Sequence, residues 1–340
     1  MTSSIKTAGS SANRHRDYGQ DMRTLDHPGP KTFPRIISLP TGPVASMEAL
    51  EPGRPLADEL FRVLNGTGLT SGMAELMGGT LEPINYCIPL PGEGGRQVSY
   101  SESRMLARGQ LIFGAATLGR RGELPWMHSH CVWLTPDGAL RSGHLWPSTT
   151  VGYPAPVALV QGLPGVELRS EDDPETGMPV FTPHPAKTPR RRTAMTEAPL
   201  TEKLSEPQTY PGRTIVARVC PNEDLATAAE EICRKYGIAN AVLRGGIGSL
   251  IGATFTDQNG SLRRVPGPGT EVATLVGHID TEPDAEGSLR AELTCTLVDR
   301  YGRVHAGRLT RGANPVAVTY ELFVQEILPA NMAGPTGTDS

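Results

Sequence analysis

Apolar residues recur along this chain with two different spacings, one typical of strands and one typical of a helix. Short apolar or alternating runs predict strands at residues 35–39, 72–77, 84–88, 110–117, 157–160 and 166–168. The stretch Pro55–Leu64 instead has apolar residues at positions 56, 60, 61, 63 and 64, which suits the inner face of an amphipathic helix. Gly66 and Gly68 follow, where a helix is expected to end.

The same pattern begins again after residue 210. Thr214–Val219 predicts a strand and 224–236 a helix, with Asn222 as its N-cap and Gly237 at its end. Residues 237–250 align with residues 68–81 at a constant offset of 169, and residues 291–309 align with residues 127–145 at an offset of 164. The sequence therefore predicts an α+β protein of two tandem related units.

The composition between these patterns sets the expected boundaries. Polar, Pro-rich or aperiodic stretches are typical of tails and linkers. The expected organisation is a disordered tail (1–32), a first unit (33–183), a Pro-rich linker (184–210), a second unit (211–328) and a second tail (329–340).

Three of the eight histidines lie within Trp126–Leu145. His128 and His130 are two residues apart, so on a strand both imidazoles point to the same face. A turn signal at residues 135–138 predicts a β-hairpin whose return strand brings His144 opposite them. Three converging imidazoles suit zinc or a similar divalent metal and leave one coordination position open.

The second unit keeps the scaffold of this hairpin without its histidines. At the offset of 164, the three histidines become Glu292, Thr294 and Arg308. A purely structural need for histidine would apply to both copies, so the asymmetry favours a site in the first unit.

Composition narrows the possible functions and locations. A net charge of −4 disfavours a nucleic-acid-binding surface, which needs clustered Lys and Arg. The five cysteines show no C-x-x-C spacing and predict reduced thiols of a cytoplasmic protein. No apolar window reaches the length of a membrane span.

Each half resembles the plant and prokaryote conserved (PPC) domain. The features that carry the resemblance are the helix followed by Gly, the Gly-Ser/Thr-Leu motif, and the block formed by His128, His130, Asp137, Gly138 and His144. The resemblance implies trimeric assembly and, in each unit, an antiparallel-dominated β-sheet packed by a helix. The overall fold is similar to that of acetolactate decarboxylase and of a zinc-bound ester hydrolase, which implies a metal-dependent lyase or hydrolase. Plant members bind DNA through an AT-hook outside this domain, and the acidic neighbours of Gly53–Pro55 argue against one here.

Metal-assisted chemistry on a carboxylate needs an acid/base group and a cation, and several residues are candidates. Glu75, Arg104 and Arg141 are the catalytic candidates, with Glu75 nearest a Gly-Gly turn that the fold would bring toward the hairpin. Glu102, Glu123 and Arg108 are further possibilities. For each, an exposed, solvated side chain is the alternative.

The favoured function is a metal-dependent carbon–carbon lyase or hydrolase that acts on a small carboxylate or carbonyl compound through a zinc-like centre. A non-catalytic binding or regulatory module and a DNA-associated protein are the alternatives. The expected partners are a small-molecule substrate and further copies of the chain, with the second unit completing the assembly.

Overall fold

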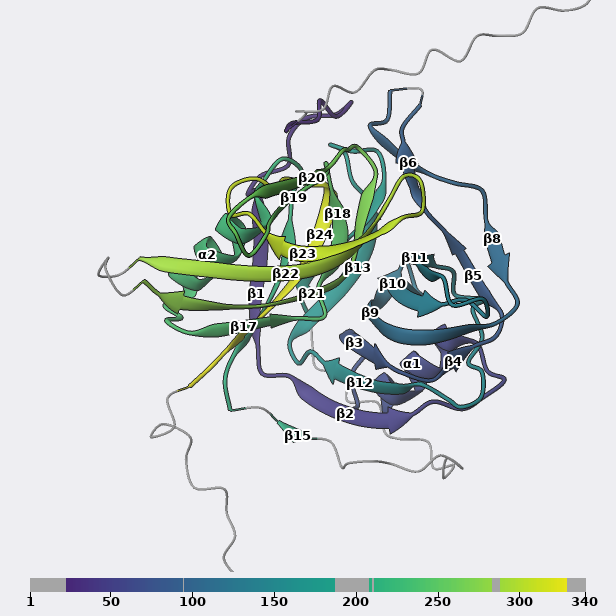
Figure 1. The fold of residues 1–340 in the computed structure, drawn as a ribbon. Coiled ribbons are helices and arrows are strands. Elements are labelled where there is room, and N and C mark those ends of the chain that lie inside the picture. Colours follow the sequence, from purple (N-terminus) through teal and green to yellow (C-terminus); the bar gives the residue numbers. More distant parts are fainter. Residues whose placement is uncertain (1–22, 94, 187–207, 210, 283–287, 329–340) are drawn as a thin grey trace, which may run out of the picture.

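The computed structural model describes residues 23–93, 95–186, 208–209, 211–282 and 288–328 (Figure 1). In these residues the protein is dominated by antiparallel β-sheet and contains two helices. One sheet has twelve strands, a second has ten, and a small hairpin forms a third sheet. No helix in the described part of the chain is long and apolar enough to cross a membrane.

The twelve-stranded sheet carries the first unit. Its main path is β15-β2-β12-β3-β9-β10-β11-β5-β8, with β4, β13 and β14 attached beside it. Helix α1 (Leu56–Gly66) packs Leu56, Leu60, Val63 and Leu64 against this sheet. The strands are β2 (Val44–Ala49), β3 (Gly72–Met77), β4 (Thr80–Leu81), β5 (Ile84–Cys87), β8 (Arg104–Leu106), β9 (Gly109–Arg121), β10 (Leu124–Leu134), β11 (Leu140–Leu145), β12 (Val157–Gly162), β13 (Val166–Asp172), β14 (Pro179–Pro185) and β15 (Gln208–Thr209). The separate hairpin is formed by β6 (Pro89–Pro91) and β7 (Val98–Tyr100).

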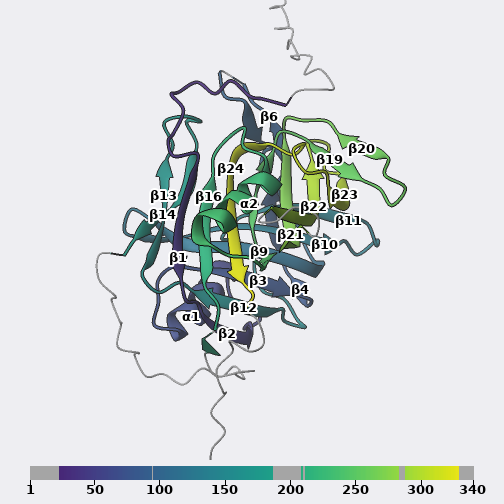
Figure 2. The ribbon, with the colours of Figure 1, turned by 90° about the vertical axis from the view of Figure 1, so that its left-hand side faces the viewer.

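The ten-stranded sheet carries the second unit. Its main path is β1-β16-β24-β17-β21-β22-β23-β19-β20, with β18 paired to β21 and β24. Helix α2 (Leu225–Tyr236) covers its outer face, with the first sheet behind it in Figure 2. The strands are β1 (Ile36–Thr41), β16 (Thr214–Val219), β17 (Ala241–Arg244), β18 (Ile247–Leu250), β19 (Ala253–Thr256), β20 (Leu262–Val265), β21 (Thr270–Thr281), β22 (Leu289–Asp299), β23 (Val304–Leu309) and β24 (Val316–Glu326).

The two units repeat the same topology and register. The order β2-β12-β3-β9-β10-β11-β5-β8 has its counterpart in β16-β24-β17-β21-β22-β23-β19-β20. His130 lies opposite His144, and Thr294, 164 residues after His130, lies opposite Arg308. The alignment of the two hairpins by sequence is therefore reproduced by the strand pairing.

The predicted unit boundary is wrong at one strand on each side. β1 lies within the predicted first unit (33–183) but pairs with β16 of the second, and β15 lies within the predicted linker (184–210) but pairs with β2 of the first. Apolar alternation marks a strand without specifying its neighbour, so the sequence could not assign β1 to a sheet. The two units are joined by this exchange.

The predicted helix start also needs correction. Asp224, and not Asn222, is the N-cap of α2, because its carboxylate accepts from the backbone N–H of Thr227. Asn222 has a φ of 68° and uses its side chain to bind the backbone of Leu25.

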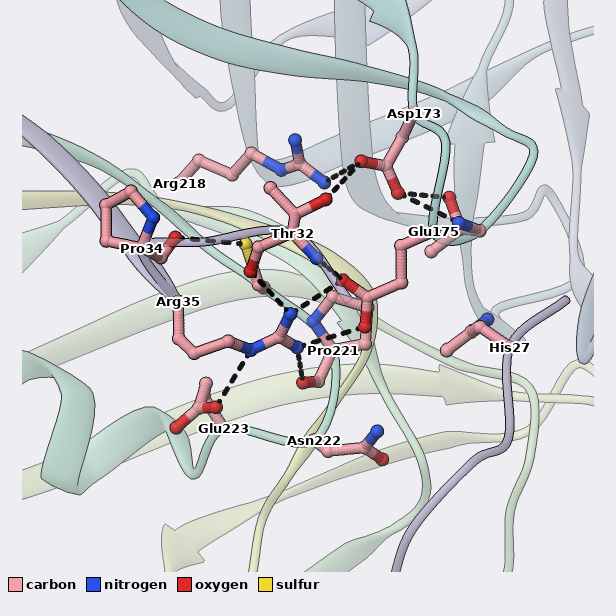
Figure 3. A network of polar contacts seen from close by, with 12 residues as sticks. His27, Thr32, Pro34, Arg35, Asp173, Glu175, Arg218, Pro221, Asn222 and Glu223 are labelled. Atoms are coloured by element: carbon pink, nitrogen blue, oxygen red, sulfur yellow. Dashed lines mark hydrogen bonds and ion pairs between the residues drawn. The ribbon is translucent and has the colours of Figure 1, made fainter. Parts of the chain in front are cut away.

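Residues 23–32 were expected to be disordered, but they pack on both units. Leu25 is buried, and His27 donates from Nε2 to the carbonyl of Ala317. The adjoining residues join a buried polar network, in which Arg35 binds Glu175 and Arg218 binds Asp173 (Figure 3). This network could not be anticipated, because its members come from segments that are distant in the sequence.

The faces opposite the helices meet between the sheets. Met73 and Phe181 of the first unit pack with Val216 and Phe323 of the second in a shared apolar cluster. Strand β21 contacts β9, β10 and β11, which places the second unit over the histidine-bearing strands.

Candidate metal centre

The three histidines converge between β10 and β11. His130 and His144 are direct cross-strand partners, and His128 lies two residues from His130 on the same face. The Nε2 atoms of His128 and His130 are 3.1 Å apart. One nitrogen from each ring can be chosen such that all three lie within 4.8 Å of one another. The structure therefore brings together the three residues selected from the sequence.

The second unit fixes the orientation of two of these rings. His128 Nδ1 lies 2.8 and 2.9 Å from the two carboxylate oxygens of Glu321. His130 Nδ1 lies 2.8 Å from the carbonyl oxygen of Val272. Carboxylate and carbonyl oxygens only accept hydrogen bonds, so each Nδ1 carries the proton and donates it outward. Outward donors of this kind orient metal-binding histidines.

The resulting arrangement fits a bound cation. With Nδ1 protonated on both rings, two Nε2 lone pairs face each other at 3.1 Å and repel, unless a proton or metal ion lies between them. His144 Nδ1 is also buried, with no hydrogen-bond partner in the described part of the chain. Three imidazole nitrogens within 4.8 Å of one another are a suitable donor set for a divalent transition metal.

The electrostatics of the site keep two of the rings neutral. Burial lowers the pKa of His144 to about 3, and the charge of His128 acts in the same direction. Burial, together with the two neighbouring histidines, also lowers the pKa of His130. Burial opposes protonation of His128, but the charge and hydrogen bond of Glu321 outweigh it and raise its pKa. Neutral rings are the form that binds metal, so His130 and His144 are ready to bind, whereas a protonated His128 releases its Nε2 proton when it becomes a ligand.

A second carboxylate of the second unit lies beside the histidines. Glu271 Oε1 is 3.6 Å from His130 Nε2, and both side chains are almost completely buried. Burial raises the pKa of Glu271 to about 7, while hydrogen bonding from Tyr100 and the charge of His128 act against this rise. Its other oxygen, Oε2, has no hydrogen-bond partner among the described residues.

Tyr100 belongs to a segment that the second unit lacks. In the first unit, residues 88–103 separate β5 from β8 and contain the β6–β7 hairpin, whereas the equivalent strands β19 and β20 are joined by residues 257–261. The Tyr100 ring lies 5.4 Å from that of His144. The extra segment thus occurs in the unit that has the histidines and contributes an aromatic side chain beside them.

The two units contribute different groups to one site. Glu271 pairs with Val298, and Val298 lies 164 residues after Leu134 of the first unit. Leu134 pairs with Gln110, so Gln110 is the first-unit counterpart of Glu271. Glu321 pairs with Arg218, and the equivalent pair in the first unit is Val157 with Ala49. The first-unit counterpart of Glu321 is therefore Val157. The first unit thus supplies the imidazoles, while the second supplies carboxylates at positions where the first has none.

Glu271 and Glu321 were not among the residues predicted from the sequence. Each lies within a strand rich in apolar residues, and both are buried. A carboxylate in such a strand is unusual without a partner, and this signal could have identified both residues.

The predicted acid/base and carboxylate-binding residues lie elsewhere. Glu75 is buried and bonded to Arg244, two strands away from His130 in the sheet. Arg104 pairs with Tyr86 and Arg141 with Trp133, and these two aromatic rings pack together on the face opposite the histidines. Alternation along the strand therefore turns both arginines away from the site.

The remaining candidates also lie away from the site. Glu102 is exposed, Glu123 is exposed and pairs with Arg120, and Arg108 pairs with Glu82 at the surface.

With this geometry established, the chain can be compared with known proteins. Residues 207–328 match the Plants and Prokaryotes Conserved (PCC) domain. This match confirms the predicted resemblance for the second unit. No curated protein matches the chain.

Three solved structures illustrate the range of similar proteins. A PPC protein from Pyrococcus horikoshii is 27% identical, with 35% of this chain and 80% of that chain covered and a TM-score of 0.29. A metal-containing protein from Archaeoglobus fulgidus is 17% identical, with coverages of 47% and 99% and a TM-score of 0.33. A candidate DNA-binding protein from Ralstonia eutropha is 16% identical, with coverages of 40% and 88% and a TM-score of 0.34.

Proposed function

We propose that this protein binds a divalent metal ion through His128, His130 and His144 and is a metal-dependent lyase or hydrolase. The observation that carries the proposal is the pair of Nε2 atoms facing each other at 3.1 Å while both Nδ1 atoms are engaged outward. The proposed substrate is a small carboxylate or carbonyl compound. Zinc is the proposed metal, because three imidazoles are a common zinc-binding set.

A metal held by three histidines acts as a Lewis acid toward a carbonyl group and lowers the pKa of bound water. The protein groups have separate tasks around it. Glu321 and the Val272 carbonyl keep the His128 and His130 rings oriented. Glu271 takes the role first assigned to Glu75. Because its carboxyl has a pKa of about 7, it can both accept and return a proton near neutral pH.

A structural metal that joins the two units is the second candidate. It is favoured by the position of the site between the units, with His130 and Glu271 almost fully buried. The two functions differ in what Glu271 contributes. Catalysis needs its proton transfer, whereas a structural site needs only the histidines and their orienting groups.

A substrate screen with two variants separates these functions. Metal-loaded protein would be tested against 2-oxo acids, 3-oxo acids, esters and lactones. We expect turnover of one class, a loss of at least about 100-fold in Glu271→Gln with metal content unchanged, and near-normal turnover in Glu75→Gln. Glu75→Gln is the matched control, since it also neutralises a buried carboxylate between the units. Absence of turnover across the screen, with metal bound and both units stabilised by it, would favour the structural function.

A further inference from the structure

Two hydrogen-bond donors next to His128 are buried and have no partner in the described part of the chain. They are the Thr117 hydroxyl on β9 and the indole Nε1–H of Trp146, just after β11. An indole N–H can only donate, and a buried donor left unpaired costs about 1–3 kcal/mol. Two such donors, one on each side of His128, therefore point to an acceptor that binds over this histidine.

The strand register places these donors on either side of His128. Thr117 is the direct partner of His128 on β9, so their side chains share a face. On the other side His130 pairs with His144, which puts Trp146 level with His128. The backbone keeps this course beyond β11, because Trp146 N–H donates to the Asn85 carbonyl at 2.8 Å. The Trp146 ring lies 5.5 Å from that of His144.

Exposure shows from which side a ligand could approach. His128, His144 and Trp146 are partly exposed, and Tyr100 is 37% exposed. His130 and Glu271 are almost completely buried, so they form the end of the site that is closed to solvent. A ligand that enters past Trp146 and Tyr100 would meet the donors beside His128 and would extend toward Glu271.

We propose that Thr117 and Trp146 bind the carboxylate of a small acid, with the Thr117 hydroxyl and the Trp146 indole N–H donating to its oxygens. A carboxylate is the acceptor that these donors bind most strongly, since hydrogen bonds to a charged oxygen are roughly twice as strong as neutral ones. Arg104 and Arg141, the residues first predicted to bind a carboxylate, are turned away from this face. Thr117 and Trp146 would bind the carboxylate in their place. The inference rests on the proposed function, because the bound acid would lie over the histidine cluster.

The test is calorimetric titration of the full-length protein with pyruvate, using the neutral pyruvamide for comparison. We expect saturable binding of pyruvate, weaker binding of pyruvamide, and a loss of affinity of about tenfold in Thr117→Val and in Trp146→Phe. Thr117→Ser keeps the hydroxyl and is expected to bind like the wild type.

Trp133→Phe is the matched control. The Trp133 Nε1 is also buried without a partner among the described residues, but this ring packs against Tyr86 on the opposite face. Its removal should leave pyruvate affinity unchanged, and metal content should be unchanged in every variant.

The outcomes distinguish this inference from the proposed function. Absence of pyruvate binding, or equal affinity in wild type, Thr117→Val and Trp146→Phe, would overturn the carboxylate site even if metal is bound. Donor-dependent pyruvate binding by a protein that takes up no metal would support the carboxylate site and contradict the metal proposal.

Discussion

At the residue scale, orientation of the imidazoles depends on groups that the second unit provides. Glu321 holds His128 through Nδ1, and the backbone carbonyl of Val272 holds His130. The histidines themselves were predictable, because the two-residue spacing and the turn fix their face and register locally. Glu321 was not, since 193 residues separate it from His128 and only the packing of the two sheets joins them.

Glu321→Gln is expected to weaken metal binding by about 10- to 100-fold, because the ring loses its charged outward partner. The measurement is competition with a chromophoric chelator for zinc. Glu75→Gln, which removes the charge that Arg244 binds, should leave the metal affinity unchanged. Equal affinities for wild type and Glu321→Gln would show that Glu321 does not support the metal.

At the scale of elements, the two units are connected by exchanged strands and by buried ion pairs. β1 crosses to the second sheet, and Arg218 of β16 binds Asp173, which follows β13. The existence and type of most elements followed from local periodicity, including both helices. The pairing of strands between the units could not be predicted in this way, because an edge strand has the same alternation of apolar and polar residues whichever sheet it joins.

Breaking the buried pair should be costly. Arg218→Met leaves Asp173 buried without its ionic partner, and we expect the free energy of unfolding in urea to fall by about 3–5 kcal/mol. A double variant, Arg218→Met with Asp173→Leu, should recover much of that loss, because no unpaired charge remains. A double variant that is as unstable as the single one would mean that the ion pair is not the source of the effect.

The N-terminal segment that contacts the second unit should loosen in mild acid. Burial lowers the pKa of His27 from 6.5, so the folded chain binds this proton less readily than the unfolded chain. The stabilisation from neutral His27 is therefore complete above pH 6.5 and is lost as the pH falls below that value. Hydrogen exchange around residues 25–32, corrected for its intrinsic pH dependence, should accelerate from pH 7 to pH 5.

His27→Gln provides the control for this pH effect. Glutamine can still donate to the Ala317 carbonyl but does not titrate in this range. Its exchange should be nearly independent of pH, and an unchanged acceleration in the variant would assign the effect to another group.

At the scale of the whole molecule, the three-histidine cluster and its hydrogen-bonding partners lie between two unlike units that share one topology. Internal repetition was visible in the sequence because the hairpins retain Cys, Gly and Leu at matching positions, such as Cys131 and Cys295. The relative placement of the units could not be seen in the sequence, since it depends on how well their two surfaces fit together. Met73 and Phe323, for example, pack in one apolar cluster between the units. The groups around the histidines thus come from both units, although the most recognisable residues lie in one.

A site shared between units should couple their unfolding. We expect one cooperative transition in differential scanning calorimetry, raised as a whole by zinc, with about 2.7 kcal/mol of stabilisation at a free concentration 100 times the dissociation constant. Two transitions, of which zinc shifts only one, would show that the second unit takes no part in binding.

The most direct test of the central claim is the metal content of untagged protein, measured by elemental analysis beside a His128→Ala/His130→Ala double variant. We predict about one divalent ion per chain, in keeping with one three-histidine site, and its loss in a variant that keeps the wild-type circular dichroism spectrum. A wild-type protein that carries no metal after purification, and takes up none on reconstitution with zinc, iron or manganese, would contradict the account.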